Sequence, residues 1–179
     1  MCRIDQHLGL FGQHAVREGN RQGGMTGSSA VEGLRHQQAA LAAFGSFALR
    51  EDDLQKILEE AARVCAVSLN VPYAKICRYR ADQNDLFVVA GHGWHANVVG
   101  FVVSRADETS TQGRTFVTGE PVIVDDTSSS NGFSLPPSYA EHGILSTADV
   151  LIKGEAGAWD ILEVHSPIKR RFDQHDIVY

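Results

Sequence analysis

The sequence predicts an α+β domain in which an antiparallel sheet is covered by helices. Apolar residues recur every three or four positions over residues 31–69, which is the period of amphipathic helices. After Pro72 the period changes to two, and short apolar runs separated by turn residues follow in pairs, as in β-hairpins. Helices followed by strands joined as hairpins are typical of the α+β class, because hairpins connect antiparallel strands.

Two helices are predicted before the strands. The first covers residues 31–49 and carries a seam at three- and four-residue steps, which consists of Leu34, Gln37, Leu41, Phe44 and Ala48. A polar residue on such a seam is usual where helices pair in a defined register, so we favour pairing with a second copy over packing within one domain alone. The second helix covers residues 54–69, with Asp52 and Gln55 as its expected capping box.

Six short strands are expected in the rest of the chain. They cover residues 74–80, 86–91, 98–104, 122–124, 148–153 and 159–165. A short helix over residues 109–118 ends at Gly119, and one helical turn over residues 138–142 ends at Gly143. The serine-rich residues 127–137 are expected to form an irregular loop.

The two ends of the chain differ from its middle. Residues 1–30 hold six of the 17 glycines and are expected to form a flexible tail, whereas residues 31–179 form the domain. Asp173 is expected to cap a last helix with Asp176 at its third position, and about one helical turn follows. An isolated helix needs roughly 12 residues or more, so we expect the domain to be truncated at the start of this helix.

Composition and charge exclude several classes of protein. The chain has 16 Lys and Arg against 22 Asp and Glu, a net charge of −6, and no basic cluster, so nucleic-acid binding is not expected. No apolar run reaches the roughly 18 residues of a membrane-spanning helix, and membrane insertion is not expected. Cys2, Cys65 and Cys77 are too scattered for a disulfide framework or a zinc site, which favours the cytoplasm.

A succession of motifs resembles the GAF domain family. In chain order the motifs are GHGW at residues 91–94, VV at 102–103, GRTFVTGEPVIVDD at 113–126, EHGILS at 141–146, ILEVHS at 161–166 and RFDQHDI at 171–177. The resemblance extends over roughly residues 34–179. The ILEVHS motif before Arg-Arg-Phe resembles GAF domains that precede bacterial sensor histidine kinases, and HWE-type kinases are the most similar.

The resemblance implies a GAF-like fold, related to the PAS fold, with a six-stranded antiparallel sheet and helices on both sides. The terminal helices would pack on one face and mediate dimerisation, and a pocket for a small molecule or chromophore would lie on the other. The chain departs from the family at Asp160, where Gly is usual. It also lacks the cyclic-nucleotide signature and the Cys-His pair that attaches a bilin, because Cys65 and Cys77 precede Ala and Arg. No cofactor is therefore identified.

Eight residues are candidates for the ligand-binding site. They are Trp94, Phe101, Arg114, Phe116, Asp125, Phe133, Tyr139 and His142. The aromatic members lie where they would border the implied pocket, although each taken singly also suits a core position. Arg114 is placed near a helix start, where it would help to hold an anion or instead pair with Asp125. His142 beside Gly143 suggests a local capping role.

The sequence favours a non-catalytic sensory module, the N-terminal input domain of a two-component histidine kinase. A ligand or a redox change would shift the arrangement of its paired helices. One alternative is a haem- or metal-binding redox sensor that uses histidines of the strand region: His92, His95, His142 and His165. Another is an enzyme similar to the GAF methionine sulfoxide reductases, although Cys65 and Cys77 do not match loop cysteines. No catalytic elbow, phosphate loop or zinc-protease motif occurs.

Overall fold

The computed structural model describes residues 24–95, 98–129, 132–154 and 157–177, and it confirms the predicted order of helices and strands. The helices are α1 (Gly24–Ala48), α2 (Leu54–Ser68), α3 (Thr111–Thr118), α4 (Pro137–Glu141) and α5 (Gln174–Ile177), and a short 3-10 turn, η1, covers Thr127–Ser129. The strands are β1 (Tyr73–Arg80), β2 (Asp85–His92), β3 (Val102–Arg105), β4 (Val122–Val124), β5 (Ser146–Gly154) and β6 (Gly157–Ser166).

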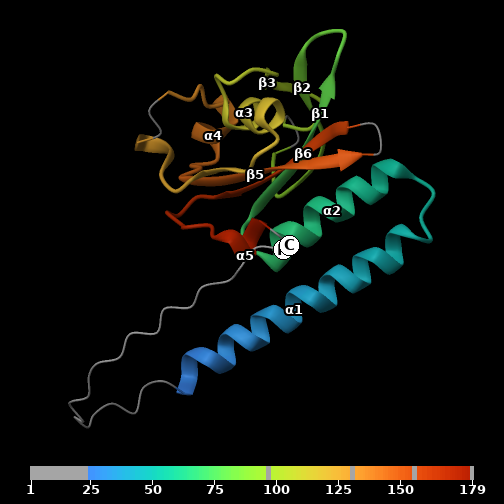
Figure 1. Ribbon diagram of the computed structural model, residues 1–179, viewed down its shortest axis with the longest axis vertical. Helices are drawn as coiled ribbons and strands as arrows, with labels where there is room; N and C mark the ends of the chain where they lie inside the picture. The colour runs from blue at the N-terminus through green and yellow to red at the C-terminus, as the bar shows by residue number, and fades with distance from the viewer. Residues whose placement is uncertain (1–23, 96–97, 130–131, 155–156, 178–179) are drawn as a thin grey trace, which may run out of the picture.

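The described residues contain one antiparallel sheet of six strands in the order β3-β2-β1-β6-β5-β4 (Figure 1). Its central pair, β1 and β6, runs from Tyr73 opposite His165 to Arg78 opposite Asp160. The buried Asp160 carboxylate accepts two hydrogen bonds from the Arg78 guanidinium, at 3.2 and 3.0 Å, and so joins the two strands at this end. The antiparallel α+β fold predicted from the sequence is confirmed.

Helix α2 covers one face of the sheet because its apolar side chains recur at helical spacing. Leu58, Ala62 and Ala66 form one buried cluster with Ala74 and Ile76 of β1. Figure 1 shows α1 running antiparallel to α2 on the side away from the sheet, with α5 near the C-terminal end of α2. The terminal helices therefore lie on one side of the sheet, as predicted.

Helix α2 starts at Leu54 as predicted, but its capping residue differs by one position. The cap is Asp53 rather than Asp52, because the Asp53 carboxylate accepts from the Gln55 backbone N–H at 2.9 Å. At the other end Asn70 takes a left-handed φ of 51°, which stops the helix before Pro72 as expected. At α5, the Asp173 carboxylate accepts from the Asp176 N–H at 3.2 Å, so the predicted cap is confirmed.

Helix α1 begins at Gly24, seven residues before the predicted start at Val31, because extending an existing helix is far easier than nucleating one. Residues 1–23 of the predicted tail and the side chain of Leu34 lie outside the described residues. Gln37 and Phe44 are half-buried, and the Gln37 side chain donates to Ser68 O of α2 at 3.5 Å. Leu41 is 49% exposed, so the predicted seam is only partly turned toward α2.

Helices α3 and α4 lie on the opposite face of the sheet (Figure 1). Ser110 caps α3 by accepting from the Gly113 N–H at 3.0 Å, and Gly119 ends it with a left-handed φ of 73°, as predicted. The third strand is shorter than predicted, because Gly100 takes a φ of 90° and the chain turns before Val102. Within the described ranges no helix combines the length and apolar character needed to cross a membrane.

Candidate functional site

The face of the sheet beneath α3 and α4 carries a group of buried ionisable side chains, here called the polar cluster. It comprises Lys75 and Cys77 of β1, Asp149 of β5, Glu163 and His165 of β6, and Tyr139 of α4, none more than 2% exposed. Side chains alternate along a strand, so Lys75 points away from α2 while Ala74 and Ile76 pack against it. The same alternation places Glu163 and His165 on this face.

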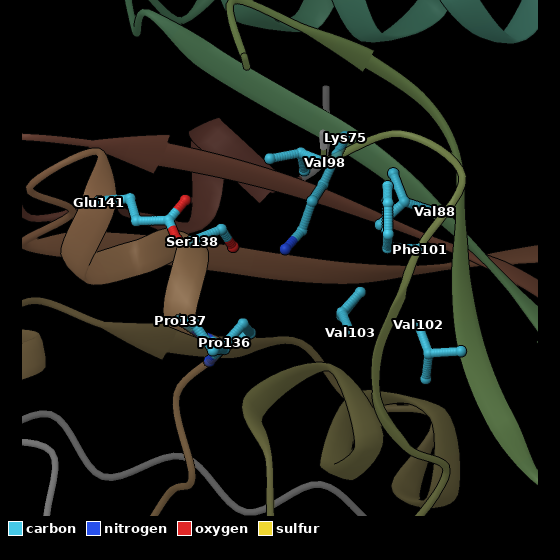
Figure 2. Close-up of a pocket in the computed structure, with 10 residues that line it drawn as sticks. All are labelled: Lys75, Val88, Val98, Phe101, Val102, Val103, Pro136, Pro137, Ser138 and Glu141. Atoms are coloured by element: carbon cyan, nitrogen blue, oxygen red, sulfur yellow. The ribbon is translucent and has the colours of Figure 1, made fainter. Parts of the chain in front are cut away.

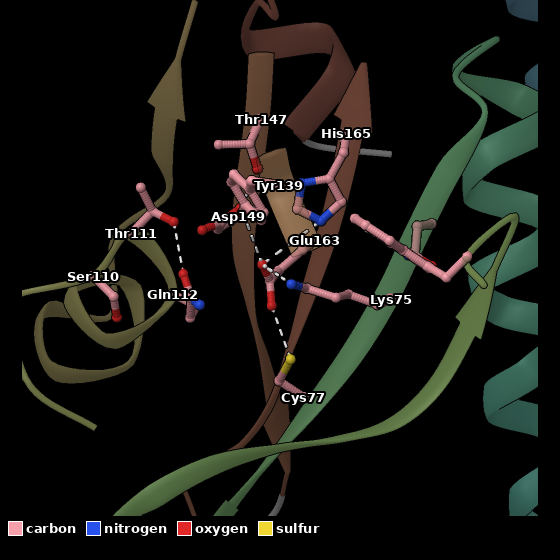
Figure 3. A network of polar contacts seen from close by, with 12 residues as sticks. Lys75, Cys77, Ser110, Thr111, Gln112, Tyr139, Thr147, Asp149, Glu163 and His165 are labelled. Atoms are coloured by element: carbon pink, nitrogen blue, oxygen red, sulfur yellow. Dashed lines mark hydrogen bonds and ion pairs between the residues drawn. The ribbon is translucent and has the colours of Figure 1, made fainter. Parts of the chain in front are cut away.

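Glu163 lies at the centre of the polar cluster (Figure 3). Its Oε2 atom is 3.3 Å from Lys75 Nζ and accepts a long hydrogen bond from the Tyr139 hydroxyl at 3.4 Å. Its Oε1 atom accepts from the Cys77 thiol at 2.8 Å. A carboxylate this deeply buried is stable only when it is paired and hydrogen-bonded, and these three groups supply both interactions.

The surroundings fix the protonation states of the other members. Burial alone would lower the pKa of Lys75, but the Glu163 carboxylate raises it above its usual value, and the side chain is an ammonium. Burial raises the pKa values of Cys77 and Tyr139 well above their usual range, so both carry the protons that they donate. Burial and the charge of Lys75 lower the pKa of His165 well below its usual value, which keeps its imidazole neutral.

Asp149 has the most unusual carboxyl group in the polar cluster. Burial, and then repulsion from Glu163, raise its pKa from 3.8 to about 8, although the Thr147 hydroxyl donates to its Oδ1 atom at 2.8 Å. Asp149 is therefore mostly protonated at neutral pH, and the cluster holds one ammonium and one carboxylate.

Replacing Asp149 with Asn is expected to flatten the pH dependence of stability. The pKa of Asp149 is raised on folding, so the folded chain binds the extra proton between about pH 4 and pH 8, and stability is lost as the pH rises through that window. The slope lost in the variant is roughly 1.4 kcal/mol per pH unit. Urea unfolding at pH 5, 6 and 7 measures it, with the exposed Asp82→Asn as control. If the free energy of unfolding varied with pH in the same way for the wild type and Asp149→Asn, the raised pKa of Asp149 would be contradicted.

Several buried polar atoms on this face have no hydrogen-bond partner among the described residues. They are Lys75 Nζ, Asp149 Oδ2, both ring nitrogens of His165, Gln112 Nε2 and Thr115 Oγ1. Buried polar atoms are nearly always hydrogen-bonded in folded proteins, so a concentration of exceptions needs an explanation. A bound ligand or ordered water would supply the hydrogen-bond partners of these atoms and so explain the exceptions.

A cavity of about 200 Å³ lies beside the polar cluster, with Lys75 in its wall (Figure 2). Its other lining is mostly apolar and comes from β2, the turn before β3, β3 itself and α4: Val88, Val98, Phe101, Val102, Val103, Pro136, Pro137, Ser138 and Glu141. Figure 2 shows the amine of Lys75 pointing toward the space that these side chains border. Apolar walls with a few placed polar groups are typical of small-molecule sites.

Four of the eight predicted site residues lie at or beside this cavity. Phe101 lines it directly. Tyr139 and Trp94 flank the Lys75 ammonium, with ring centroids 5.1 and 5.3 Å from Nζ, close enough for cation–π attraction. The His142 ring lies edge-on to Trp94 at 4.8 Å.

The other four predicted residues lie elsewhere. Phe116 stacks on Tyr79, with ring centroids 4.3 Å apart. Arg114 does not pair with Asp125. Instead it lies 3.5 Å from the Glu108 carboxylate, and its guanidinium is 5.1 Å from the centroid of Phe133.

Asp125 and Phe133 line a separate open hollow. There the Asp125 carboxylate lies 3.8 Å from Arg171 Nε. Arg114 pairs with Glu108 rather than with Asp125 because Glu108 lies in the turn just before α3, whereas Asp125 follows β4. The structure thus does not bring all eight residues into one site.

The four histidines do not converge either. His142 caps the end of α4 as predicted: its Nδ1 donates to Ser138 O at 2.9 Å, and its Nε2 accepts from the His95 N–H at 3.2 Å. His92 lines a groove on the α2 side of the sheet, whereas His165 is buried in the polar cluster. In the described part of the chain no group of three or more His, Cys, Asp and Glu residues is placed to hold a metal ion.

Cys65 and Cys77 are both free thiols. Burial raises the pKa of Cys65 to about 11 and raises that of Cys77 well above its usual value. The thiolate is the nucleophilic form of cysteine, so neither environment activates the sulfur.

Lys75, Asp149 and Glu163 were not among the site residues predicted from the sequence. In each strand these residues alternate with apolar ones, which is also the pattern of a strand with one face in water. One signal in the sequence indicates that this face is buried: apolar residues also occur on it, such as Ile161 two positions before Glu163.

The comparison with protein families decides the identity of the fold. The family model described as GAF domain matches residues 53–178, which is more than half of the chain. The chain belongs to the GAF domain family. A search of curated protein sequences found no match.

Several solved structures have the same fold at low sequence identity. The GAF domain of a phosphoenolpyruvate-protein phosphotransferase from Coxiella burnetii aligns with a TM-score of 0.70 and 13% identity, covering 83% of this chain and 86% of that one. Free methionine-R-sulfoxide reductase from Neisseria meningitidis aligns with a TM-score of 0.66 and 16% identity, covering 80% of each chain. A domain of a putative two-component sensor histidine kinase from Sinorhizobium meliloti 1021 aligns with a TM-score of 0.54 and 17% identity, covering 70% of this chain and 81% of that one.

These likenesses show the fold, and the family model shows that the chain is a GAF domain. GAF domains are sensory and regulatory modules. Similar folds are found in a domain of a putative two-component sensor histidine kinase and in a methyl-accepting chemotaxis protein. In this GAF domain the cavity lies on the sheet face opposite α1 and α2, which is where the sequence resemblance implied a pocket.

Proposed function

We propose that this GAF domain is the ligand-binding input module of a signalling protein and that it binds a small molecule in the cavity beside Lys75. The observation that carries the proposal is the fully buried Lys75–Glu163 pair, with Lys75 in the cavity wall. Buried ion pairs are weak stabilisers compared with well-packed apolar residues, so a role in binding is a stronger reason for one here. Trp94, Phe101, Tyr139 and His142 belong to the proposed site, of which Phe101 forms part of the wall.

Strand β1 gives the cavity a direct connection to the helices. Lys75 faces the cavity, while its neighbours Ala74 and Ile76 pack against Ala62 and Ala66 of α2 in one buried cluster. A ligand that shifts β1 therefore moves side chains in contact with α2, and α2 in turn contacts α1. Close-packed interiors transmit such displacements, which gives the domain a route from ligand to helices.

We further propose that the domain forms a homodimer through α1 and the other terminal helices. Residues 37–49 contain no charged side chain, although much of this segment is exposed. Leu41 and Val31 are 49% and 53% exposed, and Ala39, Ala42 and Ala43 would allow a second helix to approach closely. An uncharged helical surface of this length is typical of an interface.

The Leu41→Glu variant is expected to be a monomer at concentrations where the wild type is a dimer, because the carboxylate would be buried without a partner. Light scattering coupled to size-exclusion chromatography measures the mass. Val117→Glu is the matched control: Val117 is 52% exposed but lies on α3, on the opposite side of the sheet, and it should leave the dimer intact. A monomeric wild type, or a dimer unaffected by Leu41→Glu, would contradict the proposed interface.

We propose that the parent protein is a cytoplasmic two-component histidine kinase of the HWE type or a related type. Support comes from the ILEVHS motif before Arg170-Arg171-Phe172 and from the structural likeness to a putative sensor histidine kinase domain. The sequence of the gene downstream of Tyr179 tests this directly. A kinase dimerisation helix with a phosphorylatable histidine is expected there, and a different output domain would contradict the assignment.

A further inference from the structure

We propose that the ligand of this cavity is a small apolar α-amino acid, with its carboxylate on Lys75, its ammonium toward Glu141 and its side chain against the apolar wall. This inference rests on the proposed function, because it names the chemical class of the ligand at the same site.

Lys75 provides the first reason. Its ammonium is fully buried and lies 3.3 Å from a single carboxylate oxygen, Glu163 Oε2. An ammonium has three N–H donors, and among the described residues none of those of Lys75 makes a well-directed hydrogen bond. A ligand oxygen placed on the cavity side would satisfy one or two of them. Carboxylates make the strongest such bonds, because both partners are charged.

The rest of the wall provides the second reason. Val88, Val98, Val102, Val103 and Phe101 offer the ligand no hydrogen bond through their side chains. The cavity volume is about 200 Å³, and a cavity of roughly 150 Å³ is enough for benzene. The apolar part of the ligand is therefore about the size of a leucine or phenylalanine side chain.

Charge balance selects a zwitterion over a simple carboxylic acid. Within the polar cluster the Glu163 carboxylate already balances the Lys75 ammonium, and the exposed Glu141 carboxylate lies in the cavity lining. A bare anion would add negative charge to a buried site that has Lys75 as its one balancing cation within the described cluster. An α-amino acid brings its carboxylate together with its own ammonium, so it adds no net charge. Glu141 and the Ser138 hydroxyl are the acceptors in the lining for that ammonium (Figure 2).

Entry to the site requires a local side-chain movement. Lys75 Nζ is closed to water in the structure, so the ligand reaches it by displacing part of the cavity wall. Phe101 is 59% exposed although it lines the cavity, and its side chain is the most exposed of the aromatic groups here. Rotamer changes of this kind are common when proteins bind ligands.

Isothermal titration of the full 179-residue chain tests the proposal. The probes are L-valine, L-leucine and L-phenylalanine, each compared with analogues that lack one charged group; for leucine these are 4-methylpentanoate and 3-methylbutylamine. At least one amino acid is expected to bind, and each of its two analogues is expected to bind at least about tenfold more weakly, since each loses one charge-assisted contact.

The Glu141→Gln variant separates the two ends of the ligand. Because Glu141 is exposed, the variant should fold normally. It is expected to lower the affinity for the amino acid several-fold and to leave the affinity for the carboxylate analogue unchanged or slightly higher. Glu120→Gln, on the exposed turn after α3, is the control and should bind like the wild type.

Two results would overturn the inference: no amino acid of the panel binds below about 10 mM, or the deaminated analogue binds as tightly as its parent. The outcome is separate from that of the proposed function. If the chain dimerises through α1 but binds none of the amino acids tested, the proposed sensory role stands and the proposed ligand class is wrong. A chain that binds leucine as a monomer keeps the ligand class and loses the proposed dimer.

Discussion

Replacing Lys75 with methionine is expected to lower the free energy of unfolding by roughly 3–5 kcal/mol at pH 8, because the variant leaves the Glu163 carboxylate buried without its cation. Met has nearly the volume of Lys without its charge, so little of the effect comes from packing. Cys77 and Tyr139 still donate to Glu163, but two neutral donors do not replace a charge. Urea unfolding followed by circular dichroism measures the loss.

Two further variants make this prediction specific. Lys56→Met removes an exposed lysine that lies 3.5 Å from Glu51, and it should change stability by less than about 1 kcal/mol. Adding Glu163→Gln to Lys75→Met should recover part of the loss, because the double variant no longer buries a lone charge. Equal effects of Lys75→Met and Lys56→Met would show that the buried pair contributes nothing.

The fold was predictable from the sequence because each element carries a local signal. The period of α2, the turn between β1 and β2 and the glycine after α3 are all set by residues close in sequence, and the structure confirms them. The errors have local causes too. Asp52 and Asp53 are both good caps, and only the geometry of the preceding turn decides that Asp53 accepts from Gln55.

The candidate site was less predictable because it depends on contacts between distant strands. Lys75 and Glu163 are far apart in sequence, and their pairing follows from β1 lying beside β6 in that register. Whether a charged strand residue meets water or protein depends on what covers that face, and here α3 and α4 cover it. Aromatic residues such as Phe116 were assigned to the pocket by position alone, but Phe116 stacks on Tyr79 instead.

Gly113→Ala is expected to destabilise the protein by at least about 2 kcal/mol, although alanine normally stabilises a helix. A Cβ atom at this position would lie 2.0 Å from Asp107 O and 2.9 Å from Arg105 O, both backbone atoms that cannot rotate away. It would also lie 2.8 Å from the Ser110 Oγ that caps α3. The first turn of α3 must therefore move off the segment that follows β3.

The same substitution at Gly45 is the control, since Gly45 lies within α1 and a Cβ there would meet nothing within 4 Å. Gly45→Ala should stabilise the chain by about 0.5–1 kcal/mol, so the two variants are expected to shift the melting temperature in opposite directions. Because α3 carries Gln112 and Thr115 over the polar cluster, Gly113→Ala should also disturb the site. If Gly113→Ala melted at or above the wild-type temperature, the close seating of α3 against residues 105–107 would be wrong, and with it the burial of the polar cluster.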